Sequence, residues 1–75
     1  MKVTIELGAW ALRYVGQRSV VVDLDEGATV ADATSKLTIP TDEVGIVTLK
    51  GEVKNEGYVL SDGDIITVFP VVLGG

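Results

Sequence analysis

Residues 29–37, TVADATSKL, decide the fold, because the hydrophobic period becomes helical within them. Three apolar side chains recur at helical spacing: Val30, Ala33 and Leu37. Thr29 stands where a helix N-cap belongs, and Asp32 suits the positive end of a helix dipole. Pro40 prevents any continuation. The segment therefore predicts one short helix over residues 30–37, packed closely on a sheet through its alanine.

Strand patterns lie on both sides of this helix. Apolar and polar residues alternate there with the period of two that a half-buried strand requires. With the turn signal SDGD at residues 61–64, the alternation predicts strands over residues 2–7, 19–24, 44–49 and 65–71, and a minor strand over 52–54. A long loop is expected between the first two strands, where it packs on the core edge or presents a surface; it holds Trp10, Leu12, Arg13 and Tyr14.

The order of these elements, a hairpin followed by a helix and further strands, indicates an α+β fold. Helix-mediated connections between parallel strands are right-handed. The first and last strands are therefore expected side by side at the centre of the sheet, with the helix across one face. This arrangement is the β-grasp, a mixed sheet of four to five strands with one main helix. We expect a single domain over residues 1–75 with an extended tail.

Composition excludes several classes of function. The 75 residues include no cysteine and no histidine, which removes disulfides, thiolate nucleophiles and the usual zinc ligands. A net charge of -5 opposes binding to nucleic acid, whereas it suits docking on a basic protein surface or simple solubility. Lys2 leads into an alternating strand and not into a signal peptide, and no apolar run approaches a membrane span. We expect a cytoplasmic protein.

The acidic and glycine residues do not form catalytic machinery. The acidic residues fall into three groups: Asp23 with Asp25 and Glu26, Asp42 with Glu43, and Asp62 with Asp64. Clustered carboxylates can bind a cation, but none of the groups has the spacing of a calcium loop, and turn chemistry accounts for them. The glycines form no phosphate-binding fingerprint. We therefore expect no enzyme, no metal site and no bound cofactor.

The last residues carry the strongest functional signal. Gly74 and Gly75 follow directly on a core strand, where glycine does little for stability. Two residues without Cβ atoms can lie in a narrow channel and bring a bare carboxylate to a nucleotide phosphate or a nucleophile. The six residues after Phe69, extended at about 3.3 Å each, reach about 20 Å. The tail predicts delivery of the Gly75 carboxyl group into a partner's active site, the alternative being a frayed end without a role.

An exposed apolar surface is expected next to this tail. If Ile66 and Val68 point into the core, strand alternation places Ile65, Thr67 and Phe69 on the opposite face, which no helix covers. Ile46 of the neighbouring segment is expected to join them there. Such a patch is typical of a docking surface. The alternative is that Phe69 folds back over the core edge.

Three segments together resemble the MoaD/ThiS sulfur carriers. They are LRYVG at residues 12–16, EGATVAD at 26–32, and the ending from LSDGD at 60–64 through FP at 69–70 to GG at 74–75. The resemblance implies a β-grasp fold related to ubiquitin and a mechanism. A MoeB/ThiF-like activating enzyme adenylates the terminal carboxylate with ATP, a sulfur donor converts it to a thiocarboxylate, and the sulfur passes to an acceptor synthase.

The resemblance also implies roles for single residues. Gly75 is the carrier of the adenylate and the thiocarboxylate. Together with the apolar surface expected from alternation, this gives the candidate partner-binding residues Gly74, Leu73, Phe69, Pro70, Ile65 and Ile46. The FP pair is most similar to the small subunit of molybdopterin synthase, which implies the large subunit of such a synthase as the acceptor. Relatives serve thiamine, tungsten cofactor or tRNA thiolation pathways. A β-grasp interaction module or a protein modifier is the alternative.

Overall fold

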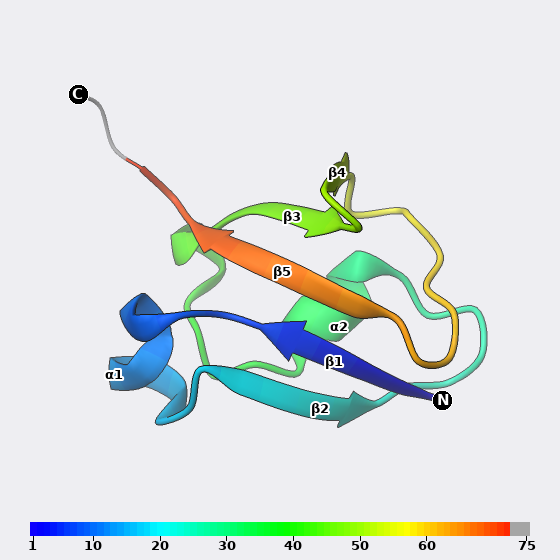
Figure 1. Ribbon diagram of the computed structural model, residues 1–75, viewed down its shortest axis with the longest axis horizontal. Helices are drawn as coiled ribbons and strands as arrows, with labels where there is room; N and C mark the ends of the chain where they lie inside the picture. Colours follow the sequence, from blue (N-terminus) through cyan, green and yellow to red (C-terminus); the bar gives the residue numbers. More distant parts are fainter. Residues whose placement is uncertain (73–75) are drawn as a thin grey trace.

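Two parallel strands form the centre of the computed structural model, which describes residues 1–72 (Figure 1). β1 (Lys2–Glu6) lies beside β5 (Ile65–Pro70), with Ile5 opposite Ile66. Both of these side chains are fully buried. The central, side-by-side position predicted for the first and last strands is confirmed.

Three further strands complete a mixed sheet in the order β2-β1-β5-β3-β4. They are β2 (Ser19–Asp23), β3 (Val44–Leu49) and β4 (Glu52–Lys54). β2 pairs antiparallel with β1, and β3 pairs antiparallel with both β5 and β4. The sheet is the predicted β-grasp, although β1, β2 and β5 each end one residue earlier than predicted.

The helix that covers the sheet is α2 (Val30–Ser35), and it is capped at the predicted residue. The Thr29 hydroxyl accepts a hydrogen bond from the Asp32 amide, and the Asp32 carboxylate accepts one from the Thr29 amide at 2.9 Å. The predicted extension to residue 37 is wrong. The hydroxyls of the last two helical residues donate to carbonyls three residues earlier, a local bonding that favours ending a helix.

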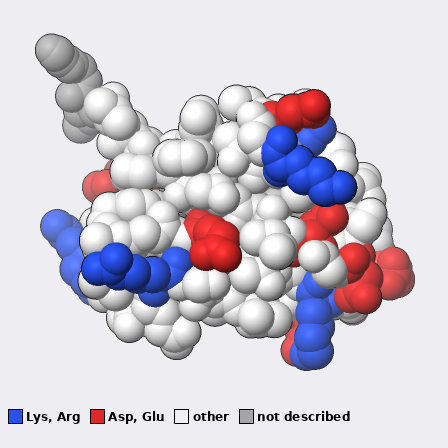
Figure 2. All heavy atoms as spheres, in the orientation of Figure 1, with Lys and Arg blue, Asp and Glu red and all other residues white. Residues whose placement is uncertain are grey.

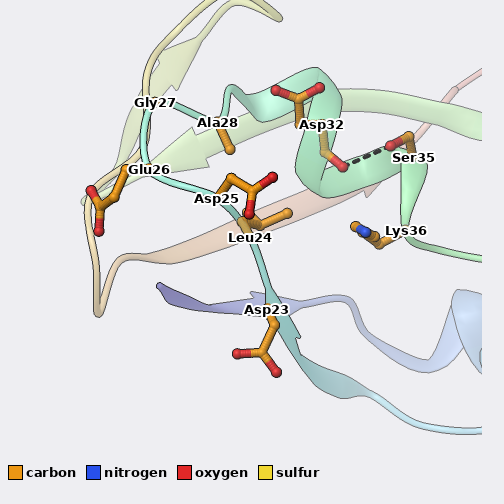
Figure 3. Close-up of a pocket in the computed structure, with 9 residues that line it drawn as sticks. All are labelled: Asp23, Leu24, Asp25, Glu26, Gly27, Ala28, Asp32, Ser35 and Lys36. Atoms are coloured by element: carbon orange, nitrogen blue, oxygen red, sulfur yellow. Dashed lines mark hydrogen bonds between the residues drawn. The ribbon is translucent and has the colours of Figure 1, made fainter.

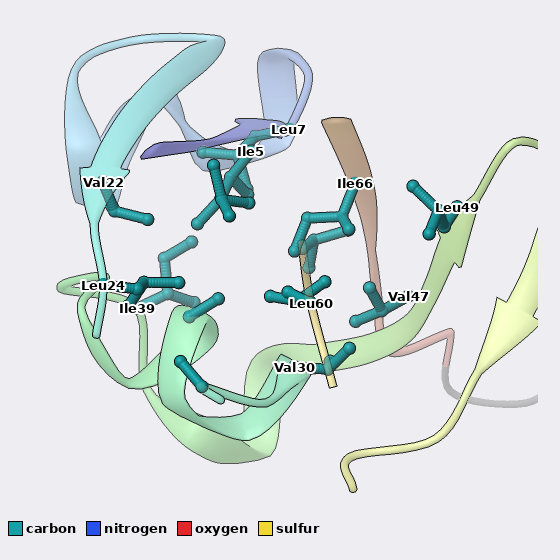
Figure 4. Close-up of a cluster of buried hydrophobic side chains, with 14 of the residues drawn as sticks. Ile5, Leu7, Val22, Leu24, Val30, Ile39, Val47, Leu49, Leu60 and Ile66 are labelled. Carbon is teal, nitrogen blue, oxygen red and sulfur yellow. The ribbon is translucent and has the colours of Figure 1, made fainter. Parts of the chain in front are cut away.

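The core lies between the sheet and α2 (Figure 4). Side chains from four strands meet α2 there, joined by Leu60 from the segment before β5. The largest fully buried ones are Ile5, Ile66, Val3, Val30 and Val68. Full burial of such a side chain contributes about 1.5–3 kcal/mol. Four of these five side chains belong to β1 and β5, so the core holds the strand that leads to the tail.

The connection between β1 and β2 is helical, which corrects the loop predicted for it. A 3₁₀ turn, η1 (Ala9–Ala11), leads into α1 (Leu12–Val15), and Gly16 ends α1 in the left-handed region at φ 77°. The Trp10 indole N–H donates to the carbonyl of Leu7 at 3.2 Å. Four residues are too few to show a helical period in the sequence.

A second 3₁₀ turn, η2 (Thr41–Glu43), connects α2 to β3. All of these helical segments are short. Within residues 1–72, none of the helices has the length and apolar character needed to cross a membrane.

Candidate functional site

β5 has one buried and one exposed face. Ile66 and Val68 are fully buried against α2, whereas Ile65 and Phe69 project from the face of the sheet that α2 leaves open. The exposed fractions are 54% for Ile65 and 43% for Phe69. The predicted exposure of Phe69 is confirmed, so this aromatic ring is accessible to a partner.

Phe69 forms part of a shallow apolar depression at the end of β5, which we call the tail-base hollow. Its lining consists of Gly45, Ile46, Phe69, Pro70, Val71 and Val72. Ile46 comes from β3, is 53% exposed, and lines the hollow together with Phe69 as predicted. None of these described lining residues is charged. Figure 2 shows an uncharged area that runs across this face of the molecule towards the tail.

The backbones of β3 and β5 approach closely at this hollow. A Cβ atom on Gly45 would lie 2.6 Å from the carbonyl oxygen of Pro70 and 2.8 Å from that of Phe69. The pairing register also shifts between Val44 and Val47, as in a β-bulge. Gly45 was not among the predicted site residues. A glycine inside a strand of β-branched residues is the signal for such an approach.

The end of β5 is anchored to β3 beyond Phe69. Pro70 pairs with Val44, and the Val71 amide donates to the Glu43 carbonyl at 3.1 Å. Proline is tolerated in this central strand because the pairing of β5 with β1 has already ended at Thr67. The sheet therefore fixes the chain through Val71.

This anchoring corrects the predicted length of the tail. The six residues after Phe69 were expected to extend beyond the body of the protein. Two of them do not, because Pro70 pairs with Val44 of β3 and Val71 is hydrogen-bonded to Glu43 of η2. The described chain leaves the body at Val72. Three predicted site residues lie outside the described residues: Leu73, Gly74 and Gly75.

Ile65 is not part of the tail-base hollow, although it lies on the same face of the sheet. Thr67 stands between Ile65 and Phe69 along β5, and its cross-strand neighbours are Glu6 and Thr48. This polar row crosses the face at its middle. Alternation predicts Thr67 on this face, but it does not predict that Glu6 and Thr48 lie beside it on the adjacent strands and divide the apolar patch.

The acidic group at the end of β2 (Asp23, Asp25 and Glu26) lines a separate pocket, in which the carboxylates point in different directions (Figure 3). The Lys2 ammonium donates to the Asp23 carboxylate at 2.8 Å, and this contact lowers the pKa of Asp23. The Thr29 amide at the helix cap likewise lowers the pKa of Asp32. Within residues 1–72, no three acidic side chains converge as metal ligands would.

The parallel β1–β5 pair, the flanking hairpins and the single covering helix define a ubiquitin-like protein of the β-grasp fold. The chain belongs to the Mut7-C ubiquitin family, whose model matches residues 2–73. This match confirms the ubiquitin-like, MoaD/ThiS-type resemblance seen in the sequence. No match was found among the curated proteins.

Solved structures of similar proteins share this fold. SAMP1 from Haloferax volcanii has a TM-score of 0.80 and 28% identity, with 100% of each chain covered. A putative molybdopterin converting factor subunit 1 from Pyrococcus furiosus has a TM-score of 0.79 and 23% identity, over 96% of this chain and 99% of that one. A chain from the complex of subunits 1 and 2 of molybdopterin-converting factor from Helicobacter pylori has a TM-score of 0.63 and 18% identity, over 100% of this chain and 100% of that one.

Proposed function

We propose that the chain is a ubiquitin-like sulfur carrier whose Gly75 carboxyl group is adenylated by a partner enzyme and converted to a thiocarboxylate. The chain is then a co-substrate of enzymes and not itself a catalyst. The tail-base hollow is the observation that carries the proposal, because it places an accessible apolar surface where the chain leaves the sheet towards two glycines. A partner that holds Phe69 and Ile46 also directs the tail.

The anchoring of Val71 sets the reach of this tail. Four residues, 72–75, follow the last described hydrogen bond to the body. Fully extended, they span about 13 Å at about 3.3 Å each. The nucleotide phosphate in the activating enzyme must then lie within this distance of the surface that holds the hollow. Gly74 and Gly75 suit a narrow channel because they have no side chains.

The proposed chemistry needs no nucleophile or base from this chain. A carboxylate oxygen of Gly75 attacks the α-phosphorus of ATP, pyrophosphate leaves, and an acyl adenylate forms. The carbonyl carbon is now electrophilic, because AMP is a good leaving group. Sulfur at the oxidation level of sulfide, supplied as HS⁻, attacks this carbon; a C–S bond forms, the C–O bond to the phosphate breaks, and AMP leaves from a C-terminal thiocarboxylate. ATP is thus a reactant in the activating enzyme and not a cofactor of the carrier.

The acceptor is proposed to be an enzyme like the large subunit of molybdopterin synthase. The sequence FP at residues 69–70 supports this choice, and the fold relative from H. pylori is in a complex with its subunit 2. A second candidate is a protein modifier, favoured by the 28% identity to SAMP1, a small archaeal modifier protein. In that case a lysine amine, in place of sulfur, displaces AMP from Gly75.

Intact-protein mass spectrometry tests the proposal. The purified chain, its activating enzyme, ATP and a sulfur donor are expected to give the mass change of one oxygen replaced by sulfur, located in the peptide that ends at Gly75. The intact mass of the native protein is measured first. A mass that shows a chain continuing past Gly75 would contradict the proposal. The thiocarboxylate is then offered to a pterin precursor with its synthase, to a tRNA and to a thiazole intermediate, and only the first is expected to accept sulfur.

Variants locate the reaction. Deletion of Gly75 is expected to abolish pyrophosphate release, because the shortened tail no longer reaches the nucleotide. Gly57→Ala is the matched control, since Gly57 lies in the turn before Val59, far along the chain from the tail, and its added Cβ meets only the Asn55 side chain at 3.5 Å. Full sulfur transfer by a chain amidated at Gly75 would refute the carrier role. Transfer to lysine without any sulfur product would favour the modifier.

A further inference from the structure

The sheet has two edge strands, β2 and β4, and each pairs with one neighbour among the described residues. β2 has five residues and β4 has three. In Figure 1, β2 runs along the lower border of the sheet with no strand beyond it. An open edge presents free N–H and C=O groups with which another strand can pair. β2 is therefore the larger site for strand addition.

Hydrogen bonds at both ends of β2 determine which of its backbone groups face outwards. The Leu24 amide donates to the Met1 carbonyl at 2.8 Å, and the Met1 nitrogen donates to the Leu24 carbonyl at 2.6 Å. At the other end, the Leu7 amide donates to the Arg18 carbonyl at 2.7 Å. Even-numbered residues thus bond to the β1 side. Antiparallel alternation directs the backbone groups of the odd-numbered residues outwards: Ser19, Val21 and Asp23.

Side chains make this edge self-complementary. Val21 lies at its centre on the open face of the sheet and is 59% exposed. Exposed Arg18 lies at one end of the strand; at the other end lie exposed Asp25 and Glu26, next to Asp23, whose carboxylate is already paired with Lys2. Antiparallel pairing with an identical strand brings the basic end of each strand to the acidic end of the other. Parallel pairing would set like charges together, which is unfavourable.

We propose that β2 pairs with β2 of a second copy of this chain, antiparallel and centred on Val21, in a two-fold dimer with one continuous sheet. In this register Val21 faces the second copy's Val21, and Ser19 faces its Asp23. The outward amides and carbonyls of these residues then bond to one another across the two-fold axis. Pairing of two five-residue strands offers few contacts compared with a standard interface of about 1,600 Å², so we expect the dimer to form only at high protein concentration.

The proposed dimer leaves the tail free. The tail-base hollow is formed by β5 and β3, and β1 separates these strands from β2. Adjacent strands lie about 4.8 Å apart, so β5 is about 10 Å from the paired edge. A dimer therefore presents two uncovered hollows and two tails. Formation of the dimer does not depend on whether Gly75 carries sulfur.

Sedimentation equilibrium and amide hydrogen exchange test the dimer on the full chain. At about 0.15 M salt, screening over about 8 Å suppresses the long-range repulsion between two chains of net charge -5. As the concentration rises to about 1 mM, the average mass is expected to increase towards that of a dimer. The Val21 amide should gain protection over the same range, whereas the neighbouring Val22 amide, already bonded to β1, should not change.

A matched pair of variants identifies the edge. Val21→Lys is expected to weaken association at least about tenfold, because two lysines would face each other across the axis. Val53→Lys, on the edge strand β4, makes the same change at a side chain 64% exposed and is expected to have no effect. A chain that stays monomeric at about 1 mM would overturn the proposal. So would association lost in Val53→Lys but kept in Val21→Lys, or protection of Val21 that appears only with a different protein.

Discussion

Substitution of Gly45 by alanine tests the close contact between β3 and β5. The new Cβ would lie 2.6 Å from the Pro70 oxygen and 2.8 Å from the Phe69 oxygen, well inside van der Waals contact. Both atoms belong to the backbone, so no side-chain rotation relieves the clash. Overpacking of this kind costs about 1–3 kcal/mol, and separation of the strands also weakens the bond from the Val71 amide to Glu43. We expect the free energy of unfolding to fall by about 2–3 kcal/mol.

Urea unfolding followed by fluorescence of Trp10, the single tryptophan, measures this loss. With a slope of about 1 kcal/mol/M for so small a protein, the midpoint should fall by about 2–3 M. Gly57→Ala is the control, because its Cβ would meet only the Asn55 side chain at 3.5 Å. The amide of Val71 should also exchange faster in Gly45→Ala.

Equal unfolding free energies for Gly45→Ala and Gly57→Ala would refute the reasoning. It would mean that β3 and β5 separate at the hollow without cost. The strands would then not fix the position at which the tail leaves the body. If Gly45→Ala lost stability but the Val71 amide did not exchange faster with solvent, the strain would lie elsewhere in β3.

Further predictions concern the hollow and the helix cap. Phe69→Ala is expected to weaken binding to the activating enzyme by about 2 kcal/mol or more while the fold stays intact. Ile65→Ala, outside the hollow, should weaken this binding much less. Equal losses of binding free energy in the two variants would show one continuous interface. Thr29→Ala should lower the free energy of unfolding by about 1 kcal/mol, measured in urea. The pKa of Asp32 is lowered in the folded chain, so its stabilising effect is present above the ordinary carboxyl pKa and is lost as pH falls through the folded value. Asp32→Asn should flatten that acid-side dependence, and an unchanged profile would contradict the cap.

The fold was largely predictable because its decisive signals are local. Alternation predicted half-buried strands over residues 2–7 and 65–71, in which Ile5 and Ile66 are fully buried, and the change of period at Thr29 located the helix start. The end of the helix was not predictable from Leu37, since the last turn responds to hydroxyl bonds of its own residues. α1 was missed because a single helical turn contains too little periodicity.

The site was only partly predictable, because part of it depends on strand register. Alternation along β5 is enough to expose Phe69. The polar row that isolates Ile65 involves Thr67 and its neighbours on two other strands, and such neighbours are set by tertiary pairing. The clash that requires Gly45 likewise arises between strands far apart in the sequence.

The parallel pairing of β1 and β5 has a mechanical consequence. The start of β1 and the end of β5 lie at opposite ends of the paired strands, with Thr4 opposite Ile65 and Glu6 opposite Thr67. A force that pulls the tail away from the beginning of the chain acts along these strands. It loads their hydrogen bonds in shear, all at once, and does not open them one after another as in an unzipping hairpin. Traction on a captured tail is therefore resisted by the centre of the sheet, and rupture is governed by the rate of forced unfolding.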